Sequence, residues 1–115
     1  MPPDSGATGV AAPSWAAAPP ATAIVTTSWD DGAVEDLELA DLLEERGLRG
    51  TFYVPVRNAE RRVLAPHDLC RLGERFEIGS HAFRHRPLKG LDAAGQHREI
   101  AGGRAYLEDV LGRPV

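Results

Sequence analysis

The 115-residue chain has little cysteine and no excess of basic residues. Its single cysteine, Cys70, excludes an intrachain disulfide. Cys70 stands in "HDLCRL" at helical spacing beside Leu69 and Leu72, so we expect it to pack against its neighbours rather than to react. Lys and Arg number 13 against 17 Asp and Glu, for a net charge of −4. We therefore expect no nucleic-acid partner, and the lack of a long apolar run predicts no membrane partner.

Residues 1–22 lack the features of a folded or targeting segment. They are rich in Pro, Ala and Gly, with one acidic residue and no Lys or Arg. A secretory signal needs a basic start and an unbroken apolar run, and prolines interrupt this segment. We expect a flexible tail over residues 1–22, a partial domain over residues 23–115 and, because no signal is seen, a cytoplasmic location.

From residue 23 onward, the pattern alternates between strand and helix. Short β-branched or apolar runs predict three strands, at residues 23–29, 50–55 and 76–79. We expect the first of these strands to be buried. Helices are predicted at residues 33–47, 65–75 and 92–111. This alternation is typical of an α/β fold in which a parallel sheet is connected by helical crossovers.

The last predicted helix has clear end signals. Asp92 suits its N-terminal cap, and Gly112 with Pro114 suits its C-terminal end. Its apolar side is predicted to consist of Ile100, Leu107, Val110 and Leu111.

Polar side chains that can bind a metal follow two of the predicted strands. "DDG" (Asp30, Asp31, Gly32) follows the first strand, and His81 and His85 follow the third. In parallel α/β folds the C-terminal ends of the strands share one edge, so both groups should meet there. A carboxylate and two imidazoles can bind Zn²⁺ or a similar ion and leave a position for water. The second carboxylate could then take a proton from that water, and Gly32 would allow a sharp bend.

Each of these motifs also has a purely structural interpretation. "DDG" is a common turn, and histidines four residues apart are commonly an exposed pair on a helix. His67 and His97 lie within predicted helices, away from any strand end, and we expect surface roles for both. What favours a metal site is the combination of carboxylates and a histidine pair at one predicted edge.

Three segments carry a family resemblance. "TTSWDDG", "RGLRGTFYVP" and "EIGSHAFRHRPL", in this order and spacing, resemble the polysaccharide deacetylases, the NodB-homology or carbohydrate esterase 4 group, over residues 23–115. The resemblance implies the N-terminal part of a distorted (β/α) barrel with parallel strands. It also implies metal-dependent hydrolysis of N-acetyl or related acyl groups on a carbohydrate, so that the partner is an acetylated sugar or oligosaccharide.

The resemblance also implies roles for single residues. Asp30 corresponds to the general base, which deprotonates the attacking water. Asp31, His81 and His85 correspond to the ligands of a divalent metal, with Zn²⁺ the first expectation and Co²⁺ or another first-row ion possible on the same ligands. The chain departs from the family pattern at Trp29, where many members have Phe, and at Ala82, where Ser or Thr is usual.

The family's later motifs, beginning with an Arg- or Tyr-Pro-x-Gly segment, do not occur in this sequence. A closed barrel needs roughly 200 or more residues, so we expect these strands to be too few to close one. The alternative function is therefore a truncated, non-catalytic fragment or metal-binding module that retains the first half of the site. Its open sheet edge could self-associate or pair with a separately encoded C-terminal half.

Overall fold

The computed structural model describes residues 11–13, 16–17 and 23–115. The predicted tail, residues 1–22, lies mostly outside the described residues, so its flexibility stays a prediction. None of the described helices is both long enough and apolar enough to cross a membrane.

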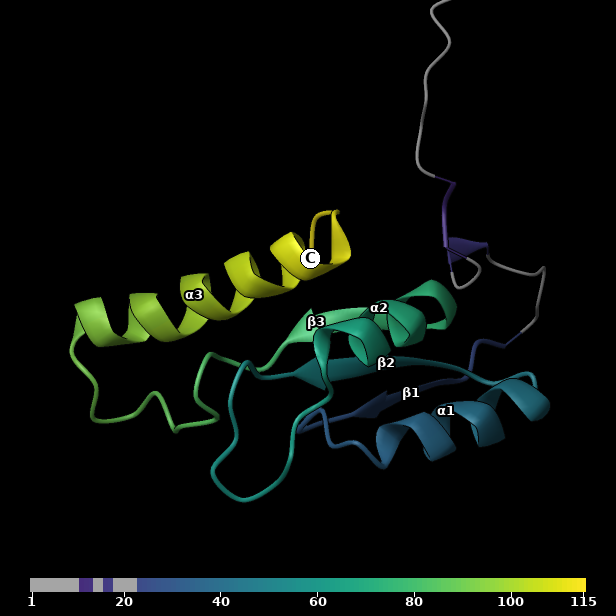
Figure 1. Ribbon diagram of the computed structural model, residues 1–115, viewed down its shortest axis with the longest axis horizontal. Helices are drawn as coiled ribbons and strands as arrows, with labels where there is room; N and C mark the ends of the chain where they lie inside the picture. The colour runs from purple at the N-terminus through teal and green to yellow at the C-terminus, as the bar shows by residue number, and fades with distance from the viewer. Residues whose placement is uncertain (1–10, 14–15, 18–22) are drawn as a thin grey trace, which may run out of the picture.

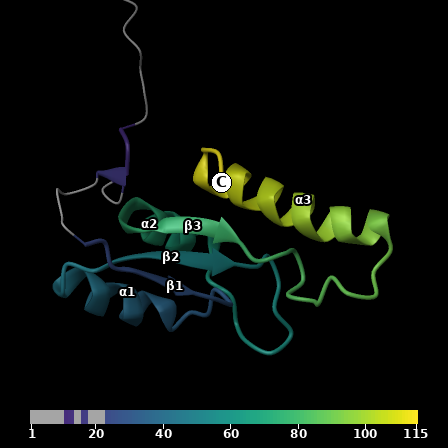
Figure 2. The ribbon, with the colours of Figure 1, turned by 180° about the vertical axis from the view of Figure 1, so that it is seen from behind.

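Strands and helices alternate along the described chain, as predicted. In order they are β1 (Thr26–Trp29), α1 (Asp36–Glu45), β2 (Arg49–Val54), α2 (Pro66–Arg75), β3 (Glu77–Ser80) and α3 (Ala93–Leu111). The strands form one parallel sheet in the order β1-β2-β3, and all three arrows in Figure 1 point to the same side. The predicted α/β class is confirmed, and the sheet is open. Seen from behind, α1 again lies on the β1 side of the sheet and α3 on the β3 side (Figure 2).

The core lies on one face of this sheet. Phe52 and Val54 of β2 point to that face, together with Ile78 of β3, which pairs with Phe52. All three helices contribute buried side chains to the same cluster: Ala40 and Leu43 from α1, Leu69 and Leu72 from α2, and Leu107 from α3. The helices therefore cover one face, and their burial of apolar surface is the main stabilising contribution.

The opposite face of the sheet is polar and open in the described part of the chain. Thr51 donates a hydrogen bond of 2.6 Å to the Glu77 carboxylate across the strands. The ring of Tyr53 lies over Gly79, where an added Cβ would come within 2.6 Å of it. This open face agrees with the expectation that the strands are too few to close a barrel.

The prediction of a buried first strand is wrong for these residues. Ile24 and Val25 precede β1 and are 89% and 71% exposed, and Trp29 at its end is 36% exposed. The physical reason is that β1 pairs with β2 alone and forms an edge of the sheet. An apolar run in the sequence does not distinguish a central strand from an edge strand.

The ends of α3 follow the sequence signals, and its buried side follows them except at Ile100. The Asp92 side chain accepts a hydrogen bond of 2.7 Å from the Gly95 amide, and Gly112 adopts a left-handed conformation. Ile100, expected on the apolar side, is 54% exposed. Leu107, Val110 and Leu111 contact the core as predicted. The buried side also contains Glu99 and Gly103, because α3 lies close to the loop after β3. Cys70 packs as expected, with its thiol 3.2 Å from the Val110 carbonyl oxygen.

The turn after β1 is held tightly against the end of β2. Gly32 has a φ of +58°, and a Cβ there would lie 2.7 Å from Cγ1 of Val54 and 3.2 Å from Cδ of Pro55. The Gly32 carbonyl accepts a hydrogen bond of 2.9 Å from the Leu64 amide. Gly32 therefore brings the chain over the end of β2 in a way that a residue with a side chain cannot.

We predict that Gly32→Ala destabilises the chain more than Gly47→Ala. Both glycines have a positive φ, but Gly47 has nothing within 4 Å of its added Cβ. Gly47→Ala should cost about 1–2 kcal/mol from backbone strain. Gly32→Ala should cost about 1–3 kcal/mol more, because the methyl group overlaps Val54. Urea unfolding of both variants measures the difference, and equal costs would contradict this account of the turn.

Asp36, at the start of α1, is a buried carboxyl group. It is 8% exposed, and its Oδ2 has no hydrogen-bond partner. Burial raises the pKa of Asp36 from 3.8 to about 6; the negative charges of Glu35 and Asp31 add to the rise, and Arg61 opposes it. The folded chain therefore keeps a proton that the unfolded chain loses at lower pH.

We predict that the free energy of unfolding falls as pH rises from about 4 to 6, because the folded state binds more protons there. The pKa difference for Asp36 corresponds to at most about 3 kcal/mol. Asp36→Asn should remove this slope and be the more stable protein above pH 6. Urea unfolding across this range measures it, with the exposed Asp109→Asn as the matched control. An unchanged slope in Asp36→Asn would refute the assignment.

Candidate metal centre

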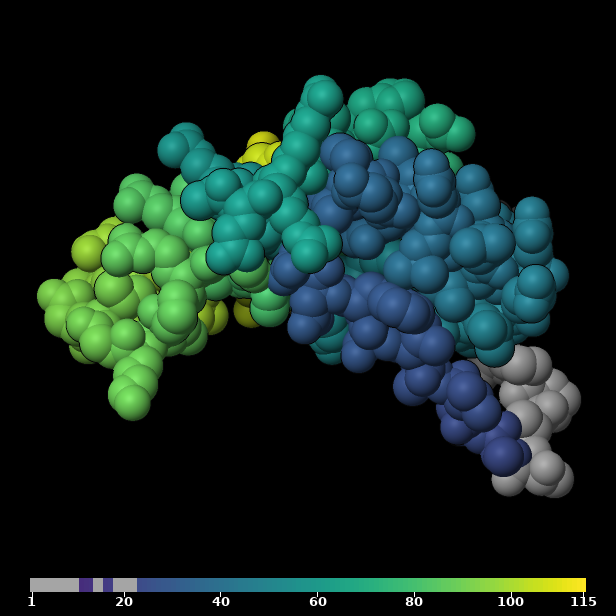
Figure 3. Space-filling model, turned by 90° about the horizontal axis from the view of Figure 1, so that it is seen from below, coloured from purple at the N-terminus to yellow at the C-terminus, as the bar shows by residue number. Residues whose placement is uncertain are grey.

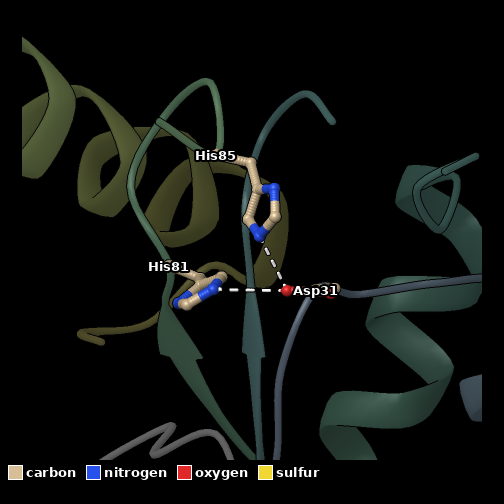
Figure 4. A group of neighbouring side chains, drawn as sticks. All are labelled: Asp31, His81 and His85. Atoms are coloured by element: carbon tan, nitrogen blue, oxygen red, sulfur yellow. Dashed lines mark ion pairs between the residues drawn. The ribbon is translucent and has the colours of Figure 1, made fainter. Parts of the chain in front are cut away.

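Asp31, His81 and His85 converge at the C-terminal edge of the sheet. One ligand atom from each lies within 4.8 Å of the other two. Nε2 of His85 is 2.7 Å from Oδ1 of Asp31, and Nε2 of His81 is 3.4 Å from the same oxygen. Figure 4 shows both rings directed at the carboxylate from the loop that follows β3. The structure thus brings together the three residues that the sequence singled out as ligands.

The two histidines face the same point because of the turn between them. His81 directly follows β3, and its amide donates a hydrogen bond of 3.2 Å to the Val54 carbonyl of β2. Ala82 and His85 have φ values of 64° and 53°, so the segment is a turn and not a helix. This turn places the two ring centroids 5.1 Å apart. The two rings therefore come together because the backbone between them turns at left-handed residues, and not because the histidines are one helical turn apart.

Unusual backbone conformation is concentrated at this centre. Among the described residues, the non-glycine positions with positive φ are Asp31, Ala82 and His85. Two of these are candidate ligands, and the third lies between the two histidines. Such conformations cost about 1–3 kcal/mol each and persist where the surrounding structure holds them. Their concentration here distinguishes this pair of loops from ordinary turns.

The centre is partly buried and reachable from solvent. The side chains of Asp31, His81 and His85 are 27%, 34% and 22% exposed. A hollow beside the histidines is lined by Glu60, Arg86 and Pro87. In the space-filling view, the blue residues after β1 adjoin the teal loop after β2 and the green segment after β3 (Figure 3). A small molecule can therefore approach the three donor atoms.

The donor set fits a divalent metal. Two imidazole nitrogens and one carboxylate oxygen are common zinc ligands, and a tetrahedral ion keeps its ligand atoms about 3.4 Å apart. The 3.4 Å between His81 and Asp31 already has that spacing. The 2.7 Å between His85 and Asp31 is a hydrogen-bond distance and would lengthen on metal binding.

Asp30 lies beside the three converging residues in sequence but is not one of them. It is exposed, and its carboxylate forms no ion pair or hydrogen bond with another residue of the described ranges. Its assignment as general base stays a prediction. His67 and His97 are both exposed and lie in α2 and α3, away from the centre, in agreement with the surface roles expected for them.

One residue that contacts the histidine loop, residues 81–85, was not predicted from the sequence. The carboxylate of Glu99 on α3 accepts hydrogen bonds from the amides of Phe83 and Arg84, between the two histidines. In the sequence Glu99 resembles any charged residue of an amphipathic helix. The signal that could have revealed it is its spacing of four from Gly95 and Gly103, the residues that share its buried side.

The comparisons with known proteins agree with this geometry. The sequence profile described as "Polysaccharide deacetylase" matches residues 17–115. An uncharacterised protein of Streptomyces coelicolor is 34% identical over 90 residues, which cover 77% of this chain and 35% of that protein. A chitin deacetylase of Pestalotiopsis sp is 32% identical over 88 residues, covering 75% of this chain and 30% of that protein. The chain thus spans about a third of the length of these curated relatives.

A solved structure supports the same fold. The Streptococcus pyogenes deacetylase PplD, determined in complex with acetate, superposes with a TM-score of 0.74 over 84% of this chain and 45% of that protein. The sequence identity is 17%, so this likeness concerns the fold alone. The family profile covers most of the chain, and two curated relatives exceed 30% identity. This chain belongs to the polysaccharide deacetylase family.

Proposed function

We propose that this chain carries the metal-binding half of a carbohydrate deacetylase site, which hydrolyses N-acetyl or related acyl groups. The observation that carries the proposal is the convergence of Asp31, His81 and His85 at the strand ends. Family membership supports the reaction class. The relative named as a chitin deacetylase supports an N-acetylated sugar as the substrate.

In this proposal Asp31, His81 and His85 hold a divalent metal, with Zn²⁺ the first candidate because its common ligands are imidazole and carboxylate. Co²⁺ and other first-row ions suit the same donors. When bound, such a metal polarises a carbonyl oxygen and lowers the pKa of water. Partial exposure of the three side chains leaves room for substrate and water beside them.

Asp30 is proposed to remove a proton from the water that attacks the acyl carbon. Its carboxylate is exposed and unpaired among the described residues, so it is free to accept a proton. The φ of 80° at Asp31 turns the backbone sharply between the two carboxylates, which supports different roles for neighbouring residues. Attack forms a carbon–oxygen bond to the acyl carbon. The carbon–nitrogen bond then breaks, and the departing nitrogen takes up the proton that Asp30 removed from the water, so that acetate and an amine are released.

We predict that the chain binds one Zn²⁺ per molecule in calorimetric titration. His81→Ala and Asp31→Ala should each abolish this binding, because two ligands hold the ion far less well than three. His67→Ala is the matched control, since His67 is an exposed histidine on α2. Zn²⁺ binding that is indifferent to His81→Ala and Asp31→Ala would refute the assignment of the ligands.

A second prediction separates metal binding from catalysis. Asp30→Asn should bind Zn²⁺ as the wild-type chain does, whereas acetate release from an N-acetylglucosamine oligomer should fall about 10²–10⁴-fold. The measurement is acetate release by each protein after saturation with Zn²⁺. A wild-type chain that binds the metal and releases no acetate would instead favour the non-catalytic metal-binding module, which the open face of the sheet also suits.

A further inference from the structure

Glu99 on α3 is a buried carboxylate whose hydrogen-bond partners, within the described residues, both lie in the loop between His81 and His85. It is 7% exposed. Its Oε2 accepts a hydrogen bond of 3.1 Å from the Phe83 amide and one of 2.8 Å from the Arg84 amide. These two amides belong to the three-residue segment between His81 and His85. A carboxylate on α3 therefore binds the backbone that sets the spacing of the two rings.

The local conformation explains why two successive amides point at one oxygen. Ala82 and His85 flank these amides with φ values of 64° and 53°. Successive amides next to left-handed residues form a concavity that binds anions. The Glu99 carboxylate occupies that concavity. No Lys or Arg pairs with Glu99 among the described residues, so these two charge-assisted hydrogen bonds compensate for burying its charge.

Gly103, one turn further along α3, lets the helix approach this loop. A Cβ at Gly103 would lie 2.9 Å from the carbonyl carbon and oxygen of Ala82 and 2.8 Å from Oγ of Ser80. The helix backbone thus lies directly against the loop. At this distance the Glu99 side chain reaches the two amides. Glu99 and Gly103 lie on the same side of α3 because they are four residues apart.

The other side of the loop is held by residues that follow β2. The Arg57 amide donates a hydrogen bond of 2.8 Å to the Phe83 carbonyl. Its guanidinium lies 5.9 Å from the centre of the Phe83 ring. Ala82 has no side-chain donor or acceptor. The loop is therefore fixed through its backbone, between Arg57 on one side and Glu99 on the other.

We propose that Glu99 is a positioning residue for the metal centre. By binding the Phe83 and Arg84 amides, its carboxylate holds His81 and His85 at the spacing that two ligands of one ion need. This inference rests on the metal-binding part of the proposed function. It assigns to α3, which contributes no ligand, control over the affinity of the site.

The test is Zn²⁺ titration by calorimetry on the 115-residue chain and its variants. Glu99→Ala should weaken binding about 10–100-fold, the usual effect of losing a group that orients metal ligands. Glu99→Gln should weaken it only about fivefold, because the amide oxygen still accepts hydrogen bonds without the charge. Glu108→Ala is the matched control. Glu108 also lies on α3, accepts hydrogen bonds from Arg104 and the Val115 amide, and should leave affinity unchanged when replaced.

A second variant covers the case in which Glu99→Ala does not fold. Gly103→Ala raises helix propensity by about 0.8–1 kcal/mol, yet its methyl group would push α3 away from Ala82. We expect cooperative unfolding to be retained and Zn²⁺ affinity to fall at least about tenfold. A purely structural role for the helix would give the opposite result, because a better helix would then leave binding unchanged.

The outcomes separate this inference from the proposed function. Wild-type binding that His81→Ala abolishes, with Glu99→Ala or Gly103→Ala binding as the wild type does, overturns the role of Glu99 and keeps the metal site. A wild-type chain that binds no Zn²⁺ overturns the metal site itself, and the role of Glu99 with it. Zn²⁺ affinity that falls most in Glu99→Ala, less in Glu99→Gln and not at all in Glu108→Ala supports the inference.

Discussion

Asp31 and His81 meet although their strands do not touch. β1 and β3 each pair with β2, so β2 lies between them. Neighbouring strands are about 4.8 Å apart, which leaves the ends of β1 and β3 about 10 Å from each other. The two side chains close this distance over the end of β2, where Pro55 is buried and Gly32 lies against Val54. The rest of the site depends on this crossing.

The crossing requires backbone conformations that are unfavourable by themselves. Asp31, Ala82 and His85 all have a positive φ, and each costs free energy relative to an ordinary loop residue. Contacts from distant parts of the chain offset this cost. The Leu64 amide binds the Gly32 carbonyl on the β1 side, and Glu99 binds the loop amides on the β3 side. The centre is thus held by segments that contribute no ligand.

Much of the fold and the candidate ligands could be predicted from the sequence, because those signals are local. Alternating strand and helix patterns indicate a parallel sheet, and a parallel sheet brings residues after β1 and β3 to one edge. The Asp92 cap and the Gly112 end of α3 depend on neighbouring residues only. The family profile then agreed with a resemblance already evident in the three motifs.

The features that were predicted wrongly or not at all depend on contacts between segments that are distant in the sequence. The exposure of Ile24 and Val25 depends on which strand lies at the sheet edge, and residue pattern alone does not specify this. The exposed Ile100 and the buried Glu99 reverse the usual pattern of an amphipathic helix. They do so because α3 contacts the backbone of a loop and not an apolar surface. That contact requires a hydrogen-bond acceptor, which Glu99 provides, and a glycine, Gly103, that allows the close approach.

The central claim is that Asp31, His81 and His85 together bind one divalent ion. Anomalous diffraction at the zinc absorption edge, from crystals of the chain grown with Zn²⁺, tests it most directly. The account predicts a single strong peak about 2.0–2.2 Å from a ring nitrogen of each histidine and from an Asp31 carboxylate oxygen. A peak at His67 or His97 instead, or none near Asp31, would contradict it.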